Sequence, residues 1–434
     1  MRLTVSMAMA LVAIAAVGKC IYVAPAGKSS SEADGTIERP YASLVFAQRD
    51  VAPGDTVYLR GGTYKPQVED AAGIRERIYS CAFILDKDGD GDQRRISYMA
   101  YPGERPVFDM SGFKPEGQRV SVFYVSGSWL HIKGLEVIGT QVTISTGNTQ
   151  SECFSNRGGN NNIYENLSMH DGMGIGFYLV KGADNLVLNC DAYNNFETIS
   201  GRGGNVDGFG CHPAPGGTGN VIRGCRAWWN SDDGFDLINS AEAVSIDSCW
   251  AFYNGYFPGT FDSAADGNGI KAGGYGMKER VRKISNKIPM HRVTNSLAYR
   301  NKAGGMYANH HLGGIYWSNN TASQNEWNFR MINRKSREEA VDVDGYDHVM
   351  LNNLSHSPRG VDMAFINEDK CRLENNAFKA VPDSEFISVD HNLLTAPRQA
   401  DGSLPDIDFL KPKPGSSTAM KMQGYTFTDK LQTK

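Results

Sequence analysis

Residues 185–254 decide the fold, because they hold three copies of one short pattern: NLVLNCDAYNN (185–195), NVIRGCRAWWN (220–230) and AVSIDSCWAFYN (243–254). Two further copies, HRVTNSLAYRN and IYWSNNTASQN, follow at 291–301 and 315–325. Each copy carries a small residue at the same place, and successive small residues lie 22 to 24 residues apart, or further where the chain has an insertion. The small residues of the series are Ser168, Ala192, Ala227, Ala251, Ala298, Ala322, Ser355 and Ala377.

This period predicts an all-β fold, a right-handed parallel β-helix. Short β-rich segments separated by turn residues, with a period near 23, are typical of this solenoid and of no helical repeat. A propeller blade needs about 40 residues and a leucine-rich repeat needs a strict leucine pattern, so neither alternative fits. Coils of a β-helix stack at about 4.8 Å, and equivalent residues therefore form columns along the molecule.

Two polar columns follow from the alignment. An asparagine recurs three residues after the small residue and is expected to bond turn backbone along the stack. A cysteine recurs two residues before the small residue. We expect buried, stacked thiols in this column, with a Cys190–Cys225 disulfide as the alternative. The residues of the two columns are Asn195, Asn230, Asn254, Asn301 and Asn325, and Cys190, Cys225 and Cys249.

A second block follows each copy and reads GIGF at 174, GFG at 208, GFD at 234, GIK at 269 and GMY at 305. Its middle residue is large and apolar, which predicts an interior column. Its third residue is expected to face outward. The interior column is then Ile175, Phe209, Phe235, Ile270, Met306 and Phe329, and the outward column is Gly176, Gly210, Asp236, Lys271, Tyr307 and Arg330.

The ends of the chain differ from the repeats. Residues 1–18 hold one arginine, an apolar run and small residues, which is typical of a signal peptide, so we expect a secreted or periplasmic protein. Residues 19–434 are expected to form one domain. It comprises a helical N-terminal cap with the first coils (19–130), regular coils (131–380) and a C-terminal tail that covers the ends (381–434).

Charge and hydropathy limit the partners. The chain has 44 Lys and Arg against 48 Asp and Glu, so it lacks the basic excess that nucleic-acid binding requires. After the N-terminal run, no stretch of sequence is long and apolar enough to span a membrane. We expect a monomer.

Four carboxylates fall on two adjacent coils of the predicted solenoid: Asp207, Asp232, Asp233 and Asp236. Carboxylates this close raise one another's pKa, and a hard cation relieves the repulsion. An all-oxygen cluster suits calcium, so these positions predict a Ca²⁺ site rather than a solvated acidic turn.

Lys271 lies one coil beyond Asp236 in the same column, which suggests either a salt bridge or a base. A like charge nearby lowers a lysine pKa, and a neutral amine can take a proton from carbon. Such a proton must be acidified, as at C5 of a uronic acid. The chemistry predicted from these residues is β-elimination, in which C5–H is removed and the C4–O glycosidic bond breaks.

The segments NVDGFG (205–210), SDDGFD (231–236) and GNGIKAGG (267–274) resemble polysaccharide lyase family 9. The opening from Tyr22, with PGDTVYLRGGTY at 53–64, is similar to the N-terminal cap of that family. The resemblance implies a calcium-dependent lyase acting on pectin, an acidic plant cell-wall polysaccharide. It also implies that the four aspartates hold calcium and that Lys271 is the Brønsted base.

Further residues are candidates for substrate binding. Tyr307 and Arg330 continue the Lys271 column, where Arg330 could clamp a second carboxylate. Of the adjacent His310 and His311, at most one faces the groove, and His310 is our candidate. Residues 86–97 begin like an EF-hand, but Ser97 stands where a bidentate Glu is needed. We therefore interpret 86–92 as a polar loop, with a second, weak cation site as the alternative.

Two other functions compete with the lyase. A glycoside hydrolase of the polygalacturonase type also uses neighbouring aspartates on a β-helix, although it leaves Asp236 without a role. A non-catalytic polysaccharide-binding β-helix explains the repeat but not Lys271. The sequence leaves homogalacturonan and rhamnogalacturonan I open as substrates, and endo and exo cleavage too. The insertions at 196–207, 255–266 and 272–290 are expected to shape the groove.

Overall fold

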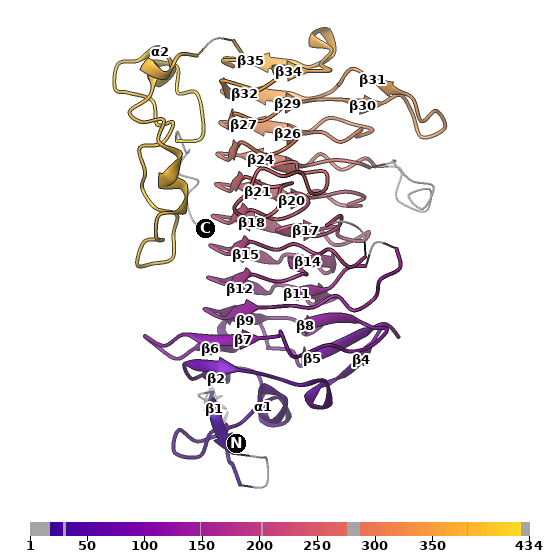
Figure 1. Ribbon diagram of the computed structural model, residues 1–434, viewed down its shortest axis with the longest axis vertical. Helices are drawn as coiled ribbons and strands as arrows, with labels where there is room; N and C mark the ends of the chain where they lie inside the picture. The colour runs from indigo at the N-terminus through magenta and orange to yellow at the C-terminus, as the bar shows by residue number, and fades with distance from the viewer. Residues whose placement is uncertain are drawn as a thin grey trace, which may run out of the picture.

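The protein is a right-handed parallel β-helix, seen in a computed structural model (Figure 1). The structure describes residues 18–28, 32–147, 149–200, 203–275, 287–379 and 381–426. The signal peptide expected at 1–18 lies, except for Gly18, outside the described residues, as does part of the insertion at 272–290. Among the described residues, no helix has the length and apolar character that crossing a bilayer requires.

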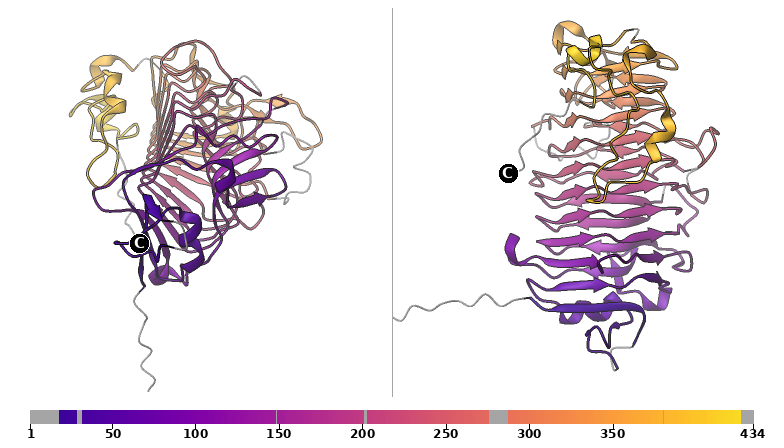
Figure 2. Two further views of the ribbon diagram at one scale, coloured as in Figure 1. Left: turned by 60° about the horizontal axis from the view of Figure 1, so that its bottom comes forward. Right: turned by 90° about the vertical axis from the view of Figure 1, so that its left-hand side faces the viewer.

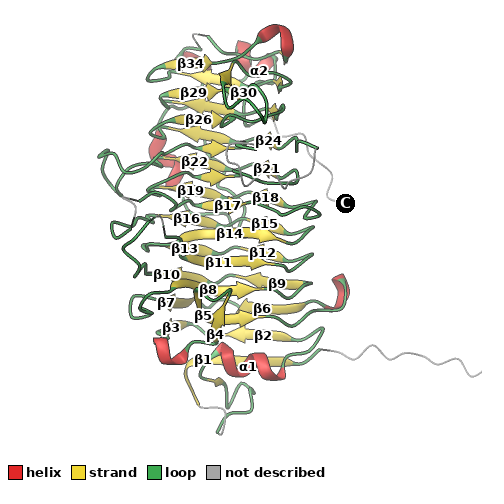
Figure 3. Cartoon of the chain, turned by 90° about the vertical axis from the view of Figure 1, so that its right-hand side faces the viewer, coloured by secondary structure: helices red, strands yellow, loops and turns green. Residues whose placement is uncertain are grey.

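Three long sheets, here A, B and C, run along the molecule, and each coil contributes one strand to each in that order (Figure 3). Within the described residues, sheet A comprises β1 (Cys20–Lys28), β2 (Thr56–Leu59), β6 (Ile96–Ala100), β9 (Leu130–Lys133), β12 (Ile163–Glu165), β15 (Leu186–Leu188), β18 (Val221–Arg223), β21 (Ser245–Asp247), β24 (Arg292–Thr294), β27 (Tyr316–Ser318), β32 (Val349–Leu351) and β35 (Arg372–Glu374). Sheet B comprises β3 (Gly62–Tyr64), β7 (Pro106–Asp109), β10 (Glu136–Ile138), β13 (Ser168–His170), β16 (Asp191–Tyr193), β19 (Arg226–Trp228), β22 (Trp250–Phe252), β25 (Leu297–Tyr299), β28 (Thr321–Ser323) and β33 (Leu354–His356).

Sheet C forms the face that carries the predicted site. Its strands are β4 (Gly73–Arg75), β5 (Tyr79–Leu85), β8 (Arg119–Val125), β11 (Glu152–Arg157), β14 (Ile175–Lys181), β17 (Phe209–Cys211), β20 (Phe235–Asp236), β23 (Ile270–Lys271), β26 (Gly304–Tyr307), β29 (Trp327–Arg330) and β34 (Val361–Ala364). A small antiparallel pair, β30 (Asn333–Arg334) and β31 (Asp342–Val343), projects beside it.

The corner between sheets B and C holds the predicted asparagine column. The residue that ends the B strand takes a left-handed conformation, as at Asn194 (φ 53°) and Tyr253 (φ 59°). The next residue is a buried asparagine whose side-chain amide donates to the side-chain oxygen of the equivalent asparagine on the following coil. These contacts run Asn195–Asn230 (3.1 Å), Asn230–Asn254 (3.0 Å), Asn254–Asn301 (2.9 Å) and Asn301–Asn325 (3.0 Å). The asparagine side chains also accept hydrogen bonds from backbone N–H groups of the turn, which no neighbouring strand can pair.

The cysteine column lies at the corner between sheets A and B. Cys190, Cys225 and Cys249 are buried free thiols, so the Cys190–Cys225 disulfide does not form. The backbone N–H of Cys190 donates to Sγ of Cys225 at 3.4 Å. On the next coil, Ser296 takes the cysteine place and accepts from the N–H of Cys249 at 3.1 Å. The Cys225 thiol therefore accepts the same kind of backbone hydrogen bond that the Ser296 hydroxyl accepts further along the chain.

The interior column of sheet C is aromatic, and its register differs from the expectation at one coil. Phe209 pairs with Phe177, not with Ile175, and Tyr178 instead of Gly176 pairs with Gly210. The prediction was wrong there because Ile175 and Phe177 are both apolar and lie two residues apart, on the same face of a strand. The column from Phe209 to Phe329 is as predicted.

Replacing Phe235 by alanine tests this interior column. Its ring is fully buried and stacks on Phe209 with centroids 5.0 Å apart. The substitution leaves a cavity, so we expect the free energy of unfolding to fall by about 3–5 kcal/mol. Thermal unfolding measures the loss, and a variant that melts at the temperature of the unaltered protein would contradict the register.

The N-terminal cap matches its prediction. A short helix, α1 (Leu44–Asp50), begins after Ser43, whose side chain accepts from the N–H of Val45 at 3.2 Å. Its buried Leu44 and Ala47 join the core of the first coils. The cap therefore covers the open apolar end of the solenoid, as the lower end of Figure 1 shows.

The C-terminal segment, which was expected to cover an end of the solenoid, also covers one of its sides. From 381 onward it runs along the outer side of sheet B, and it includes the short helix α2 (Ser417–Met420) (Figure 2). Apolar side chains of the segment form one cluster with Trp250, Phe252 and Tyr299. Arg398 donates to both carboxylate oxygens of Asp191, at 3.0 and 2.7 Å. The segment leaves sheet C, on another face, open.

Candidate active site

The outward side chains of sheet C form the floor of a groove. Paired residues on successive strands place them in one column, and the spacing of neighbouring strands separates each from the next. The column reads Tyr178, Gly210, Asp236, Lys271, Tyr307 and Arg330. The structure thus confirms the predicted order from Gly210 to Arg330 and adds Tyr178.

Three of the four predicted aspartates converge above this floor. One carboxylate oxygen from each of Asp207, Asp232 and Asp233 lies within 4.8 Å of the others. All three precede the strands β17 and β20, at the corner where the chain enters sheet C. Stacking of successive coils brings them together, although 25 residues separate Asp207 from Asp232.

Backbone and amide donors hold these carboxylates in place. Asp232 accepts from the N–H groups of Asn205 (2.7 Å) and Asp266 (3.1 Å), one on each neighbouring insertion. Asp233 accepts from the backbone N–H (2.7 Å) and the side-chain amide (2.8 Å) of Asn268. The insertions at 196–207 and 255–266 therefore orient the site, as their positions in the sequence suggest.

The cluster carries more negative charge than its surroundings neutralise. Burial and the repulsion of the other aspartates raise the pKa of Asp207 well above its ordinary value. Burial and the adjacent Asp233 raise the pKa of Asp232 to about 7. Burial also raises the pKa of Asp233, against the effect of Lys271. Removing water from like charges costs free energy, which a cation among them would recover.

Lys271 lies between the cluster and Asp236. Its Nζ donates to Asp233 Oδ2 at 2.8 Å and to Asp236 Oδ2 at 3.1 Å. Burial favours the neutral amine, but the carboxylates of Asp233 and Asp236 outweigh it and raise the pKa of Lys271 well above its ordinary value. Asp236 also accepts from the N–H of Ile238 at 2.7 Å.

The donor set fits a hard divalent cation. It consists of carboxylate oxygens whose pKa values are raised by burial and by one another, and such ligands suit calcium. Asp207, Asp232 and Asp233 would hold the ion. Asp236, the fourth residue of the predicted set, faces Lys271, and its role as a ligand stays a prediction.

The predicted substrate residues extend the groove toward the C-terminal coils. The guanidinium of Arg330 lies over the rings of Trp327 (4.5 Å) and Tyr307 (4.9 Å), and its buried Nε has no partner among the described residues. His310 contacts the hydroxyl of Tyr307 at 3.3 Å and Asp342 at 3.3 Å. The neighbouring His311 is buried and bonds the carbonyl of Pro289, whereas His310 contacts a residue of the outward column.

Sequence reasoning missed several residues near Lys271. A cavity of about 480 Å³ opens beside it, and Tyr178, His212 and Asn239 line it together with Asp266 and three of the predicted aspartates, Asp207, Asp232 and Asp236. His212 and Asn239 lie in segments that follow the strands of sheet C, outside the repeating pattern. The sequence did offer one signal for them. A polar residue comes shortly after each of two successive sheet-C segments, His212 in the pair CH and Asn239 in the pair IN.

The family assignment rests on a match over most of the chain. The family model described as "Pel9A-like, right handed beta helix region" matches residues 21–347. The chain belongs to this Pel9A-like family.

Two relatives and two solved structures resemble this Pel9A-like chain over most of their length. Pectate lyase L of Dickeya chrysanthemi is 33% identical over 89% of this chain and 81% of its own. Pectate lyase L of Dickeya dadantii (strain 3937) is 32% identical over 90% and 83%. A solved structure titled rhamnogalacturonan lyase has 47% identity and a TM-score of 0.90, covering 94% of this chain and all of its own. The structure of pectate lyase Pel9A has 30% identity and a TM-score of 0.71, over 92% and 90%.

The other candidate cation site of the Pel9A-like chain is engaged in protein contacts. The aspartates of the 86–92 loop pair with arginines or accept from backbone, which supports the interpretation as a polar loop. The contacts are Asp86–Arg75 (3.6 Å), Asp90–Arg94 (3.0 Å), Asp92–Arg95 (2.8 Å) and Asp88 with the N–H of Ser128 (2.7 Å).

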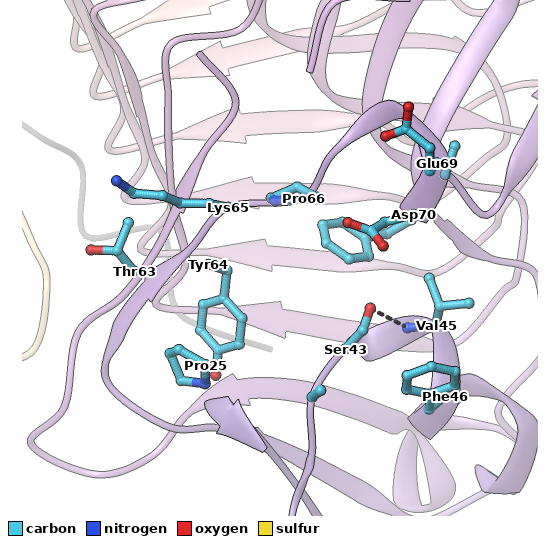
Figure 4. A pocket seen from close by; sticks show the side chains of 13 residues that line it. Pro25, Ser43, Val45, Phe46, Thr63, Tyr64, Lys65, Pro66, Glu69 and Asp70 are labelled. Atoms are coloured by element: carbon cyan, nitrogen blue, oxygen red, sulfur yellow. Dashed lines mark hydrogen bonds between the residues drawn. The ribbon is translucent and has the colours of Figure 1, made fainter. Parts of the chain in front are cut away.

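A cavity of about 440 Å³ under the N-terminal cap has a different character (Figure 4). The rings of Phe46 and Tyr64 line it, with Lys65, Glu69 and Asp70 at its margin. The hydrogen bond drawn there is the Ser43 cap of α1. It is a gap between cap and first coils, and no metal-binding group of carboxylates is found there among the described residues.

Proposed function

We propose that the protein is a calcium-dependent polysaccharide lyase that cleaves a pectic polymer by β-elimination, with Lys271 as the base. The observation that carries the proposal is the position of Nζ of Lys271, 2.8 Å from the buried Asp233 carboxylate of the three-aspartate cluster in an open groove. Membership in the Pel9A-like family supports it, as do the names of its relatives, which are pectate lyases and a rhamnogalacturonan lyase.

The chain's own residues supply proton transfer and orientation. Lys271, as the neutral amine, takes the proton from C5 of a galacturonic acid unit. The C5–H electron pair forms the C4–C5 double bond, the C4–O bond breaks, and the leaving oxygen gains a proton from solvent. When bound, calcium offsets the carboxylate charge that holds the pKa of Lys271 high, and it stabilises negative charge on the uronate carboxylate.

Arg330 supports recognition of an acidic polymer. Its guanidinium lies in the Lys271 column, two coils beyond, with the ring of Tyr307 beneath it. The guanidinium carries parallel N–H donors in one plane, which match the two oxygens of a carboxylate. We propose Arg330, Tyr307 and His310 as substrate-binding residues on this side of the groove.

The hydrolase alternative is less compatible with the contacts. A hydrolase needs one carboxylic acid to protonate the leaving oxygen and one carboxylate as base or nucleophile. Here Asp233 and Asp236 are both ion-paired with the same ammonium, and the remaining two carboxylates face them. A non-catalytic module has no use for an ammonium buried among carboxylates, because the arrangement costs desolvation.

The product distinguishes these functions. A lyase leaves a C4–C5 double bond conjugated to the uronate carboxylate, so we expect ultraviolet absorbance to rise when calcium-loaded enzyme meets rhamnogalacturonan I or homogalacturonan. Fragment sizes from the same reaction separate endo from exo cleavage. New reducing ends without absorbance would establish a hydrolase, and intact polymer would establish a binding module.

The proposed function also implies where the enzyme acts. A plant cell-wall polymer is met outside the cell, and the character of residues 1–18 supports export to the periplasm or the medium. We propose a monomer, because one chain supplies every residue of the site.

A further inference from the structure

We infer that the cavity beside Lys271 binds a neutral sugar of the polymer and that His212 is the residue that selects it. This inference rests on the proposed function and deepens it, because a polymer with a neutral sugar next to each galacturonic acid is the rhamnogalacturonan backbone. Homogalacturonan would place a second carboxylate at the same position.

Glycine at 210 lets two rings pack closely onto the floor of the groove. On either side in its column stand the larger Tyr178 and Asp236. A Cβ at position 210 would lie 2.9 Å from Nε2 of His212 and 2.7 Å from Cδ2 of Tyr178. The two rings therefore occupy the space that a side chain at position 210 would take, and even one methyl group would displace them.

The orientation of His212 is set by a backbone contact. Its Nδ1 lies 2.6 Å from the carbonyl oxygen of Ile238, so Nδ1 carries the hydrogen and Nε2 keeps the lone pair. The ring packs against Tyr178 with centroids 5.1 Å apart. Burial lowers the pKa of His212, which keeps the imidazole neutral although Asp236 is near. No described residue hydrogen-bonds Nε2, which is free to accept from a sugar hydroxyl.

Two amides in the cavity wall also lack partners among the described residues. They are the buried Nδ2 of Asn205, which precedes β17, and the buried Oδ1 of Asn239, which follows β20. Buried polar groups are rarely left unpaired, because the lost hydrogen bond with water is not replaced. A ligand rich in hydroxyl groups, which both donate and accept, satisfies these amides and His212 together.

The charge of the cavity excludes a second carboxylate. Four aspartates line it, and its one cation among the described residues, Lys271, is already paired. A second uronate, seated against Tyr178 and His212, would add a negative charge when Lys271 and calcium are already engaged by the first uronate, so no further cation would meet it. A neutral deoxysugar brings an apolar face for the Tyr178 ring and hydroxyls for the polar groups.

The other side of Lys271 shows a matching alternation. The next coil presents Tyr307, an uncharged ring, and the coil after that presents Arg330. One coil rises about 4.8 Å, which is close to the length of one sugar unit in an extended chain. Acidic sugars are therefore expected at Lys271 and Arg330. Neutral sugars are expected at Tyr307 and, on the other side of Lys271, at the coil of Asp236, where the His212 ring contacts the carbonyl of Ile238.

The test compares two substrates of equal length, oligosaccharides of the rhamnogalacturonan I backbone and oligogalacturonates. We expect the unaltered enzyme to cleave the first with the higher kcat/KM. His212→Phe keeps a ring beside Tyr178 but removes the acceptor, so kcat/KM on rhamnogalacturonan should fall at least tenfold. His212→Gln restores an acceptor and should recover part of the loss. Gly210→Ala displaces the rings of Tyr178 and His212 and should lower kcat/KM on the same substrate.

Calcium affinity and melting temperature are measured for each variant, and His131→Phe, on the outer face of sheet A, is the matched control. An unaltered enzyme that prefers oligogalacturonates would overturn this inference and leave the proposed function standing. Equal losses on both substrates in His212→Phe would overturn the selective role of His212. Failure to release unsaturated product from either polymer would instead overturn the proposed function.

Discussion

Lys271→Arg is expected to lose nearly all turnover, about a thousandfold or more, and Lys271→Ala to lose at least as much. Arginine keeps the charge and most of the reach toward Asp233 and Asp236, but it does not deprotonate in a protein, so it cannot accept the C5 proton. The missing step is proton abstraction, and binding of calcium and polymer should persist in both variants. Initial rates from ultraviolet absorbance, together with calorimetric binding of each ligand, separate the two effects.

Lys133→Arg is the control for this substitution, because Lys133 pairs with Glu165 on sheet A, away from the groove. It should keep full activity. If Lys271 only neutralises Asp233 and Asp236 or grips a carboxylate, arginine should replace it well. A Lys271→Arg enzyme with most of its activity would refute the base and reopen the hydrolase interpretation.

Removal of calcium is expected to abolish activity, and added calcium to restore it. Asp233 is fully buried between Asn268 and Lys271, so Asp233→Asn keeps the shape of the site and removes one charge. The calcium concentration for half-maximal activity should rise at least tenfold, because ligand charge tunes calcium affinity. A titration of activity against free calcium measures both effects.

Asp171→Asn provides the matched control, since Asp171 is exposed beside His170 on sheet B and should leave the calcium requirement unchanged. Full activity in excess chelator would contradict the metal site. An unaltered calcium requirement in Asp233→Asn would show that the ion lies elsewhere.

The repeating part of the fold was predictable because stacking turns sequence period into columns. The asparagine ladder and the buried thiols at 190, 225 and 249 follow directly from residues that recur at one place in each coil. The Asp207–Asp233 proximity was predictable for the same reason. The register at Ile175 was not, because two apolar residues on one face of β14 fit the pattern equally well.

What lies between the strands could not be predicted in the same way. His212 and Asn239 belong to connections whose path depends on packing against neighbouring coils rather than on period. The C-terminal segment likewise follows sheet B through contacts such as Arg398 with Asp191, which join residues more than 200 positions apart. The repeat therefore predicted the column that holds Lys271, while the residues beside that column could be placed only with the structure.

The fate of the C5 hydrogen tests the central claim most directly. A substrate labelled with deuterium at C5 of its galacturonic acid units is incubated with calcium-loaded enzyme, and the new ends are examined by mass spectrometry. The account predicts that each new unsaturated end has lost its deuterium, and that Lys271→Arg with calcium bound releases almost none. Saturated new ends that retain deuterium, with an oxygen taken from water, would show hydrolysis and contradict the account.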